Sequence, residues 1–303
     1  MEYFSLITGM LPSTLMIVSP ILIAAIGGMI CERAGVVNIA LEGLMLIGAM
    51  TAAITHVLLE TRIGFSIPLA LLLAALSGGL FSLIHAFASV TLGANQVISG
   101  TGINLLSNGL TVFICQLIFR MDRSMSYRMG MLPGFLGIYP TVWIALIILA
   151  IAWFVLYKHP GGLRLRAAGE YPQALAAAGV NVIMIRYIAI LISGVLAGLA
   201  GACVVLTHDI QFTVTSINGK GFIALAAVSF GRWLPLGVLG ASFLFGLSSS
   251  LAVNIFNFRS LDFLPSELFN MLPYLITLLA LVVFSGKDYA PRAVGQPYDR
   301  FKN

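Results

Sequence analysis

The chain has 303 residues, of which 59% are hydrophobic and only 9% are charged, and its formal net charge is +5. A soluble domain averages about a quarter charged residues, so this composition excludes a water-soluble globular protein and indicates an integral membrane protein. The cations are scattered among loops and form no basic face, which argues against nucleic acid as a partner.

Apolar runs along the chain have the length of membrane-spanning helices. A helix needs about 20 apolar residues to cross a bilayer, whereas a barrel strand would be shorter and would alternate in polarity. We therefore predict an all-α polytopic integral membrane protein in which residues 1–303 form a single transmembrane domain. About nine spans are expected, at 11–30, 44–58, 65–90, 97–119, 139–157, 183–206, 222–230, 235–256 and 268–284. The run at 222–230 is short for a crossing, which predicts a broken or strongly tilted helix.

A polar stretch follows the first span and contains Glu32, Arg33, Asn38 and Glu42. Ionisable side chains at membrane depth are costly, so they face a bundle interior or a water-filled path and need partners. We expect Glu32 and Arg33 to form a structural pair near the cytoplasmic surface. Asn38 and Glu42 are candidates for a translocation path.

The fourth span is rich in amides. Asn95 lies just before it, and Asn104 and Asn108 are four residues apart, which places them on one helical face. Polar side chains in a span can form hydrogen bonds between helices, worth about 0.6–2 kcal/mol each, or they can line a solute path. The sequence leaves both interpretations open for these three residues.

Three arginines, Arg120, Arg123 and Arg128, occupy the loop between the fourth and fifth spans. This loop is expected outside the cell, where a cationic loop runs against the positive-inside tendency. An acidic partner would account for the exception. The three arginines are therefore candidates for docking an extracytoplasmic binding protein.

The segment at about 158–181 is the longest polar stretch in the middle of the chain. Its cations Lys158, Arg164 and Arg166 directly follow an apolar run, and short cationic loops beside spans stay on the cytoplasmic side. The tail at about 286–303 is predicted to be cytoplasmic as well. The N-terminus is then outside and the C-terminus inside.

Within the central loop, Pro172 suits the first turn of a helix and Gly179 suits a left-handed stop. We therefore predict a short surface helix at 171–178, with a solvated connector as the alternative. The next span contains SGVLAGLAGA, whose small residues permit close contact between helices. That span is expected in the middle of the bundle.

Residues that could carry chemistry are few. The three cysteines, Cys31, Cys115 and Cys203, have no metal-ligand spacing, and the four histidines fall in different segments. The chain has no P-loop of the G-x-x-x-x-G-K-[ST] type, so energy from ATP would have to come from a partner. We expect a transporter without metal or cofactor, and not an enzyme.

Four segments together resemble the permease subunits of ATP-binding-cassette (ABC) importers. They are ERAGVVNIALEGLMLIGA at 32–49, GLRLRAAGEYPQALAAAGVNV at 162–182, SGVLAGLAGA at 193–202 and GKGFIALAAVSFGRWLPLG at 219–237. The resemblance covers most of the chain and is to the simple-sugar and nucleoside branch, which is ribose and branched-chain amino acid permease-like. The ERAGVVN…LEG form is most similar to the nucleoside type, and some relatives of that type are assigned to riboflavin uptake.

The resemblance implies a bacterial inner (cytoplasmic) membrane protein that works by alternating access. Its partners would be ABC ATPase subunits, a second and often non-identical permease subunit, and an extracytoplasmic substrate-binding protein or lipoprotein. A cytoplasmic coupling helix would dock in an ATPase groove. The residues that match this coupling segment are Arg164, Arg166, Glu170, Tyr171, Pro172, Gln173, Ala177 and Gly179.

The expected function is therefore that of an importer permease, with a nucleoside as the first candidate solute and riboflavin or a simple sugar as alternatives. A small neutral solute requires a path with few fixed charges, which suits the amides of the fourth span. A proton-coupled secondary transporter is the alternative from another class. In that case Glu42 would be the proton carrier.

Overall fold

The computed structural model describes residues 2–62, 64–127, 130, 131, 134, 137–254, 271, 275 and 289–298. All regular structure in this part of the chain is helical. The helices are α1 (Glu2–Arg33), α2 (Leu41–Leu59), α3 (Ser66–Ala86), α4 (Gln96–Phe119), α5 (Pro140–Lys158), α6 (Pro160–Glu170), α7 (Pro172–Ala177), α8 (Val182–Thr207), α9 (Lys220–Phe230) and α10 (Pro235–Asn254), with a π-helical turn at Phe87–Thr91 and a 3₁₀ turn at Val214–Ser216.

Six helices are long and apolar enough to cross a membrane: α1, α2, α3 with its π-helical extension, α4, α5 and α8. They confirm the prediction of a helical polytopic membrane protein. Helix α9 has 11 residues and spans only about 16 Å, so the seventh predicted run is indeed too short for a full crossing. The predicted span at 268–284 lies outside the described residues apart from Met271 and Leu275, so the count of nine stays a prediction.

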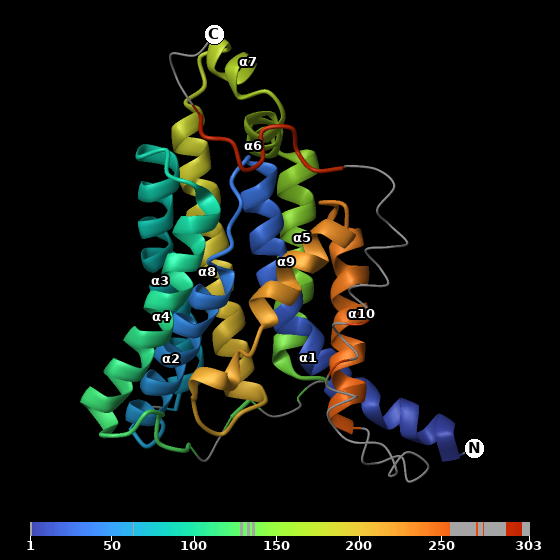
Figure 1. Ribbon diagram of the computed structural model, residues 1–303. Coiled ribbons are helices and arrows are strands. Elements are labelled where there is room, and N and C mark those ends of the chain that lie inside the picture. The colour runs from blue at the N-terminus through green and yellow to red at the C-terminus, as the bar shows by residue number, and fades with distance from the viewer. Residues whose placement is uncertain are drawn as a thin grey trace.

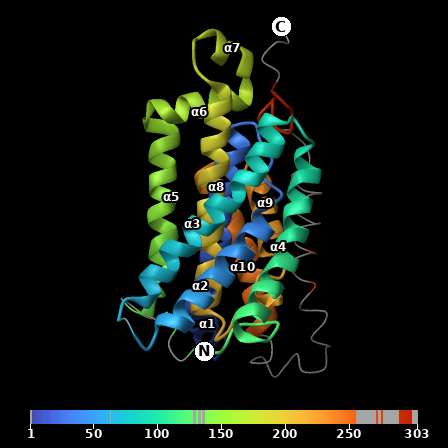
Figure 2. The ribbon, with the colours of Figure 1, turned by 90° about the vertical axis from the view of Figure 1, so that its left-hand side faces the viewer.

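Helix α8 runs through the bundle with α1, α2 and α3 packed against it (Figures 1 and 2). Glycines make this approach possible, because a Cβ at Gly201 would overlap the Met45 carbonyl oxygen and one at Gly198 would overlap the Ala74 carbonyl oxygen. Close backbone contact supplies the van der Waals attraction that holds helices together in lipid. The central position predicted for this span is confirmed.

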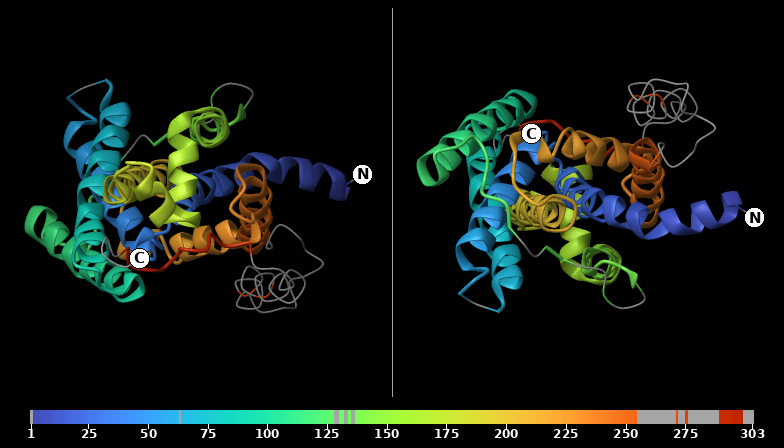
Figure 3. Two further views of the ribbon diagram at one scale, coloured as in Figure 1. Left: turned by 90° about the horizontal axis from the view of Figure 1, so that it is seen from above. Right: turned by 90° about the horizontal axis from the view of Figure 1, so that it is seen from below.

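The bundle has two distinct ends. Helices α6 and α7, residues 289–298 and the end of α1 lie at one end, and the N-terminus lies at the other (Figure 1). Seen along the bundle, α4 and α10 lie on opposite sides of it (Figure 3). The two segments that were predicted to be cytoplasmic therefore share one end.

The described cations divide unevenly between the two ends. Seven belong to segments at the α6–α7 end (Arg33, Lys158, Arg164, Arg166, Arg186, Arg232 and Arg292) and three belong to loops at the opposite end (Arg62, Arg120 and Arg123), while Lys220 lies at the start of α9 within the bundle. This excess of cations at one end is the asymmetry that membrane insertion favours for the cytoplasmic side.

Candidate coupling surface and translocation path

The segment between α5 and α8 folds into two helices. The His159 side chain accepts a hydrogen bond from the backbone two residues later, and Pro160 begins α6. Pro172 begins α7, and Gly179 has a φ of +80°, which is the left-handed stop expected from the sequence. The short helix predicted at 171–178 is confirmed as α7. Helix α6 was not predicted, although a proline such as Pro160 at the first helical position is a recognisable start signal.

The residues that match a coupling segment divide into exposed and packed ones. Five are exposed: Arg164, Tyr171, Gln173, Ala177 and Gly179. Arg166 instead stacks on the ring of Tyr157 at 5.0 Å, and Pro172 is buried. Leu175 anchors α7 in a small apolar cluster with residues of α6 and α8. The outer surface of α7 is thus small and uncharged.

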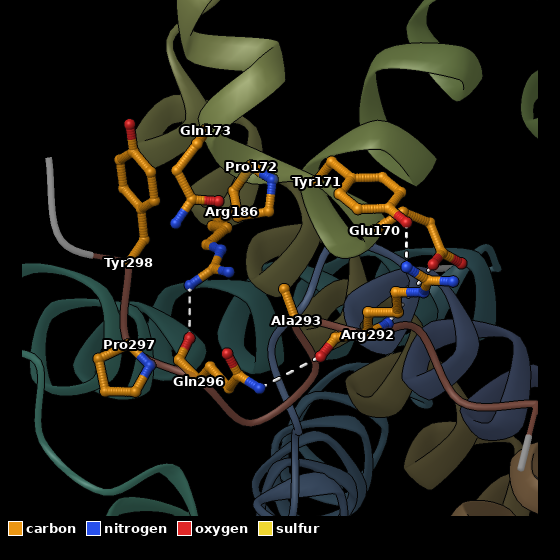
Figure 4. Close-up of a pocket in the computed structure, with 10 residues that line it drawn as sticks. All are labelled: Glu170, Tyr171, Pro172, Gln173, Arg186, Arg292, Ala293, Gln296, Pro297 and Tyr298. Atoms are coloured by element: carbon orange, nitrogen blue, oxygen red, sulfur yellow. Dashed lines mark hydrogen bonds between the residues drawn. The ribbon is translucent and has the colours of Figure 1, made fainter. Parts of the chain in front are cut away.

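Residues 289–298 pack against the coupling segment (Figure 4). The Ala293 amide donates a hydrogen bond to the Gly169 carbonyl at 2.8 Å. The guanidinium of Arg186 on α8 donates from Nη1 to the Gln296 carbonyl at 2.9 Å. The tail is therefore attached to both α6 and α8, and no pattern in the sequence predicts these contacts.

The same tail segment also joins α7 to the turn between α9 and α10. The guanidinium of Arg292 lies 5.1 Å from the ring centroid of Tyr171 and donates a hydrogen bond to its hydroxyl (Figure 4). At the other end of the segment, the Arg232 guanidinium lies 4.6 Å from the ring centroid of Tyr289. Residues 289–298 thus form a strap across this end of the bundle.

Residues 34–40 connect α1 to α2 inside the bundle without regular helix. Irregular backbone at membrane depth is tolerated only where protein groups satisfy its hydrogen bonds. Gln96 accepts a hydrogen bond from the Val37 amide at 2.7 Å, and His85 Nε2 donates to the Val37 carbonyl at 3.1 Å. Two polar side chains that were not among the predicted site residues thus support this segment.

The amides predicted for a path lie in different surroundings. Asn104 is buried; it accepts from the Gly43 amide at 2.8 Å and donates to the Ile39 carbonyl at 2.9 Å, so it fixes the start of α2. Asn38 is buried and donates to a serine of α8 at 2.8 Å. Asn108 is exposed and donates to the Asn104 carbonyl of its own helix.

Helix α4 presents a mixed outer surface, in which exposed large apolar residues such as Ile98, Leu105 and Phe113 lie among polar and small ones. Its exposed residues include Thr101, Gly102, Asn108, Gly109 and Gln116, and no described atom lies within 4 Å of a Cβ built at either glycine. Asn95 caps the helix by accepting hydrogen bonds from the amides of Val97 at 2.9 Å and Ile98 at 3.2 Å. Polar side chains within a membrane span normally avoid lipid, so the exposed Thr101, Asn108 and Gln116 are unusual for a surface that would contact lipid alone.

Glu42 joins the beginnings of two helices. Its carboxylate accepts hydrogen bonds from the amides of Gly219 and Gly221, each at 2.7 Å. These amides belong to the start of α9, where the unpaired N–H groups and the helix dipole favour a negative charge. Because α9 begins inside the bundle (Figure 1), these two amides lie away from bulk water, and Glu42 supplies the acceptor that they need.

The other end of α9 is held by α1. Trp233 Nε1 donates to the Glu32 carboxylate at 2.5 Å, and Arg33 Nε donates to the Trp233 carbonyl at 3.1 Å. The expected pair between Glu32 and Arg33 is thus replaced by two contacts with Trp233. Arg232 and Trp233 both have positive φ, at 53° and 54°, a conformation that non-glycine residues adopt only when their surroundings hold them there.

The arginine loop lies at the end opposite α6 and α7 (Figure 1). Arg120 and Arg123 are exposed, and Arg128 lies outside the described residues. Beyond them the chain is anchored, since the Ser124 amide donates to the Phe212 carbonyl at 3.0 Å. Arg120 and Arg123 are therefore exposed on a loop whose next residue is held by a backbone hydrogen bond.

Comparison with known proteins gives matches over the whole chain. The family model described as branched-chain amino acid transport system / permease component matches residues 10–281. The chain is 39% identical to the guanosine ABC transporter permease protein NupQ of Bacillus subtilis, over 100% of both chains. It is 37% identical to the nucleoside ABC transporter permease protein NupC of Lactococcus lactis, over 94% of each chain.

A more distant relative is the putative glucose ABC transporter permease protein TsgC13 of Haloferax volcanii, at 33% identity over 82% of this chain and 78% of the relative. The family match covers nearly all of the helical bundle, and the two most similar of these relatives align over almost their full length. The chain therefore belongs to the branched-chain amino acid transport system permease family.

Proposed function

We propose that the chain is a permease subunit of an ABC importer and that its solute is a nucleoside. The observation that carries this proposal is the 39% and 37% identity, over nearly the whole chain, to permeases named for guanosine and for nucleosides. On this proposal, ATP hydrolysis takes place in separate ATPase subunits. A second permease subunit and an extracytoplasmic binding protein complete the transporter.

Reconstituted transport tests the proposal. The chain would be co-purified with the products of neighbouring genes, incorporated into proteoliposomes and supplied with ATP and radiolabelled guanosine. Uptake is expected to require ATP and to be inhibited by excess unlabelled nucleoside but not by ribose or riboflavin. Competition by ribose or riboflavin alone would assign a different solute. Uptake that survives ATP depletion but not an uncoupler would favour the secondary transporter.

A simple sugar is the second candidate solute. Its support is the 33% identity to a putative glucose permease. The nucleoside is favoured because both of the more similar relatives named above carry nucleoside names and align over more of the chain. Riboflavin stays an expectation from the sequence.

The α6–α7 end is proposed to face the cytoplasm, because seven of the described cations lie there (Arg33, Lys158, Arg164, Arg166, Arg186, Arg232 and Arg292). A membrane-impermeant thiol reagent can test this, since Cys31, Cys115 and Cys203 are buried and give little background. A cysteine at Gln173 is expected to react only after the cells are permeabilised. A cysteine at Met125, exposed at the opposite end, should react in intact cells. Reaction of the Gln173 position from outside would reverse the topology.

The exposed face of α7 is proposed to dock in an ATPase groove. A small side chain such as Ala177 permits close approach, so Ala177→Phe is expected to lower solute-stimulated ATP hydrolysis at least about tenfold, the equivalent of ~1.4 kcal/mol of docking energy. The permease itself should stay folded, because the added ring points away from the bundle. Ala94→Phe, at an exposed position of the α3–α4 loop at the same end, is the matched control. Equal ATPase activity in both variants would remove α7 from the docking surface.

The outward face of α4 is proposed to line the solute path together with the second permease subunit, because polar groups such as Asn108 are disfavoured against lipid. Asn108→Leu is expected to reduce uptake several-fold while leaving the Tm unchanged. Asn104→Ala should lower both, because two backbone groups of residues 39–43 lose their partner. Thermal unfolding and uptake measured on both variants separate the two roles. Full uptake by the Asn108 variant would exclude this face from the path.

A further inference from the structure

A buried arginine at the α6–α7 end has no counter-ion among the described residues. The Arg186 side chain is only 1% exposed, and the single hydrogen bond of its guanidinium runs from Nη1 to the Gln296 carbonyl. Nε and Nη2 have no hydrogen-bond partner in the described part of the chain, and no described carboxylate forms an ion pair with Arg186. Arginine stays protonated in proteins, so the charge is present, and its costly burial is offset only in part by the ring of Tyr298, whose centroid lies 5.9 Å from Cζ.

A cavity of about 150 Å³ lies beside this guanidinium, between α7 and the tail (Figure 4). Its polar lining comes from both sides: Gln173 and Tyr171 from the coupling segment, Arg292 and Gln296 from the tail. The Glu170 carboxylate lines the end nearest Arg292 and accepts a hydrogen bond of 3.5 Å from the Arg292 amide. With Arg186 included, the lining carries two cations and one anion.

We propose that this cavity is a binding site for a phosphate group. A guanidinium presents paired N–H donors that match the oxygens of an oxyanion, and charge-assisted hydrogen bonds of this kind are among the strongest in proteins. Two guanidinium groups and two carboxamides surround the cavity. Nη1 of each arginine and Nε2 of Gln296 already donate one hydrogen bond within the protein, and the remaining N–H groups still outnumber the two oxygens of a carboxylate. A phosphate group offers enough acceptors and also supplies the charge that Arg186 lacks.

The phosphate group can come from a soluble compound or from the headgroup of an anionic lipid. Basic pockets at the cytoplasmic ends of membrane helices bind such headgroups, so both sources share one chemistry. An occupant would connect α7, α8 and the tail through a single charge. The site would thereby stabilise the surface proposed to dock the ATPase, whatever solute the transporter carries.

Thermal unfolding of the purified full-length chain tests the site. Inorganic phosphate, titrated at constant ionic strength, is expected to raise the Tm saturably by about 2–4 °C. The rise should be lost in Arg186→Gln and kept in Arg164→Gln, which removes an exposed cation at the same end. In a second arm, nanodiscs of phosphatidylcholine are compared with nanodiscs that also contain phosphatidylglycerol. A rise confined to phosphatidylglycerol and lost in Arg186→Gln would identify the lipid as the source.

The absence of a saturable rise in both arms, or an equal rise in Arg186→Gln, would overturn the proposal. So would stabilisation that requires the ATPase subunits, because the missing anion would then be a side chain of the partner. If Arg186→Gln does not fold, Arg292→Gln decides the question, since Arg292 is exposed and its loss leaves the core intact. An unchanged response to phosphate in that variant would also overturn the proposal.

Discussion

Replacing Glu42 with alanine is expected to destabilise the protein by about 3–6 kcal/mol, because two hydrogen bonds to a charged group are lost and each contributes about 1.5–3 kcal/mol. The amides of Gly219 and Gly221 would be left unsatisfied at the start of α9, inside the bundle. Without the carboxylate, α9 keeps only its packing contacts with α2 and loses the hydrogen bonds that join the two helices. Uptake is expected to fall at least about tenfold, and the Tm of the purified chain should fall with it.

Glu42→Gln distinguishes this structural role, in which the carboxylate holds the start of α9, from the role of a proton carrier. One amide oxygen can still accept a backbone hydrogen bond, so we expect a Tm between those of the wild type and Glu42→Ala, with residual uptake that depends on ATP. A proton carrier would instead lose all uptake in the glutamine variant. Asp122→Asn, at an exposed position between Arg120 and Arg123, is the control for a lost carboxylate. A wild-type Tm for Glu42→Ala would show that the hydrogen bonds of Glu42 to α9 do not stabilise the protein.

Gly201→Ala is expected to prevent correct packing of α2 against α8. The added Cβ would overlap the carbonyl oxygen of Met45, which is backbone and cannot rotate away. Overpacking of this kind costs about 1–3 kcal/mol or more. The variant should therefore give a lower Tm and a smaller folded fraction by size-exclusion chromatography in detergent.

Gly240→Ala is the control that tests whether alanine destabilises only where the helices are closely packed. Gly240 lies on α10 with no described atom within 4 Å of a built Cβ, and alanine favours helix over glycine by about 1 kcal/mol. Gly240→Ala should therefore leave the Tm unchanged or raise it. Equal Tm values for the variants at Gly201 and Gly240 would show that close packing at α8 does not limit stability.

The sequence by itself determined the features that depend on composition and local pattern. Hydropathy identified the membrane helices, because burying backbone in lipid requires long apolar helices. The proline and glycine of the central loop, Pro172 and Gly179, predicted α7 from the backbone conformations that these residues favour. The small residues of SGVLAGLAGA predicted that α8 lies in the middle of the bundle.

Only the tertiary structure decided which polar groups meet. Glu42 binds amides 177 and 179 positions away, and Arg186 binds a carbonyl 110 positions away. Spacing along one helix made Asn104 and Asn108 look alike, yet one supports residues 39–43 and the other faces outward. A side chain's role depends on the backbone that folding brings beside it. Because all the helices of the bundle are similarly apolar, the local sequence pattern does not specify which distant residues will come into contact.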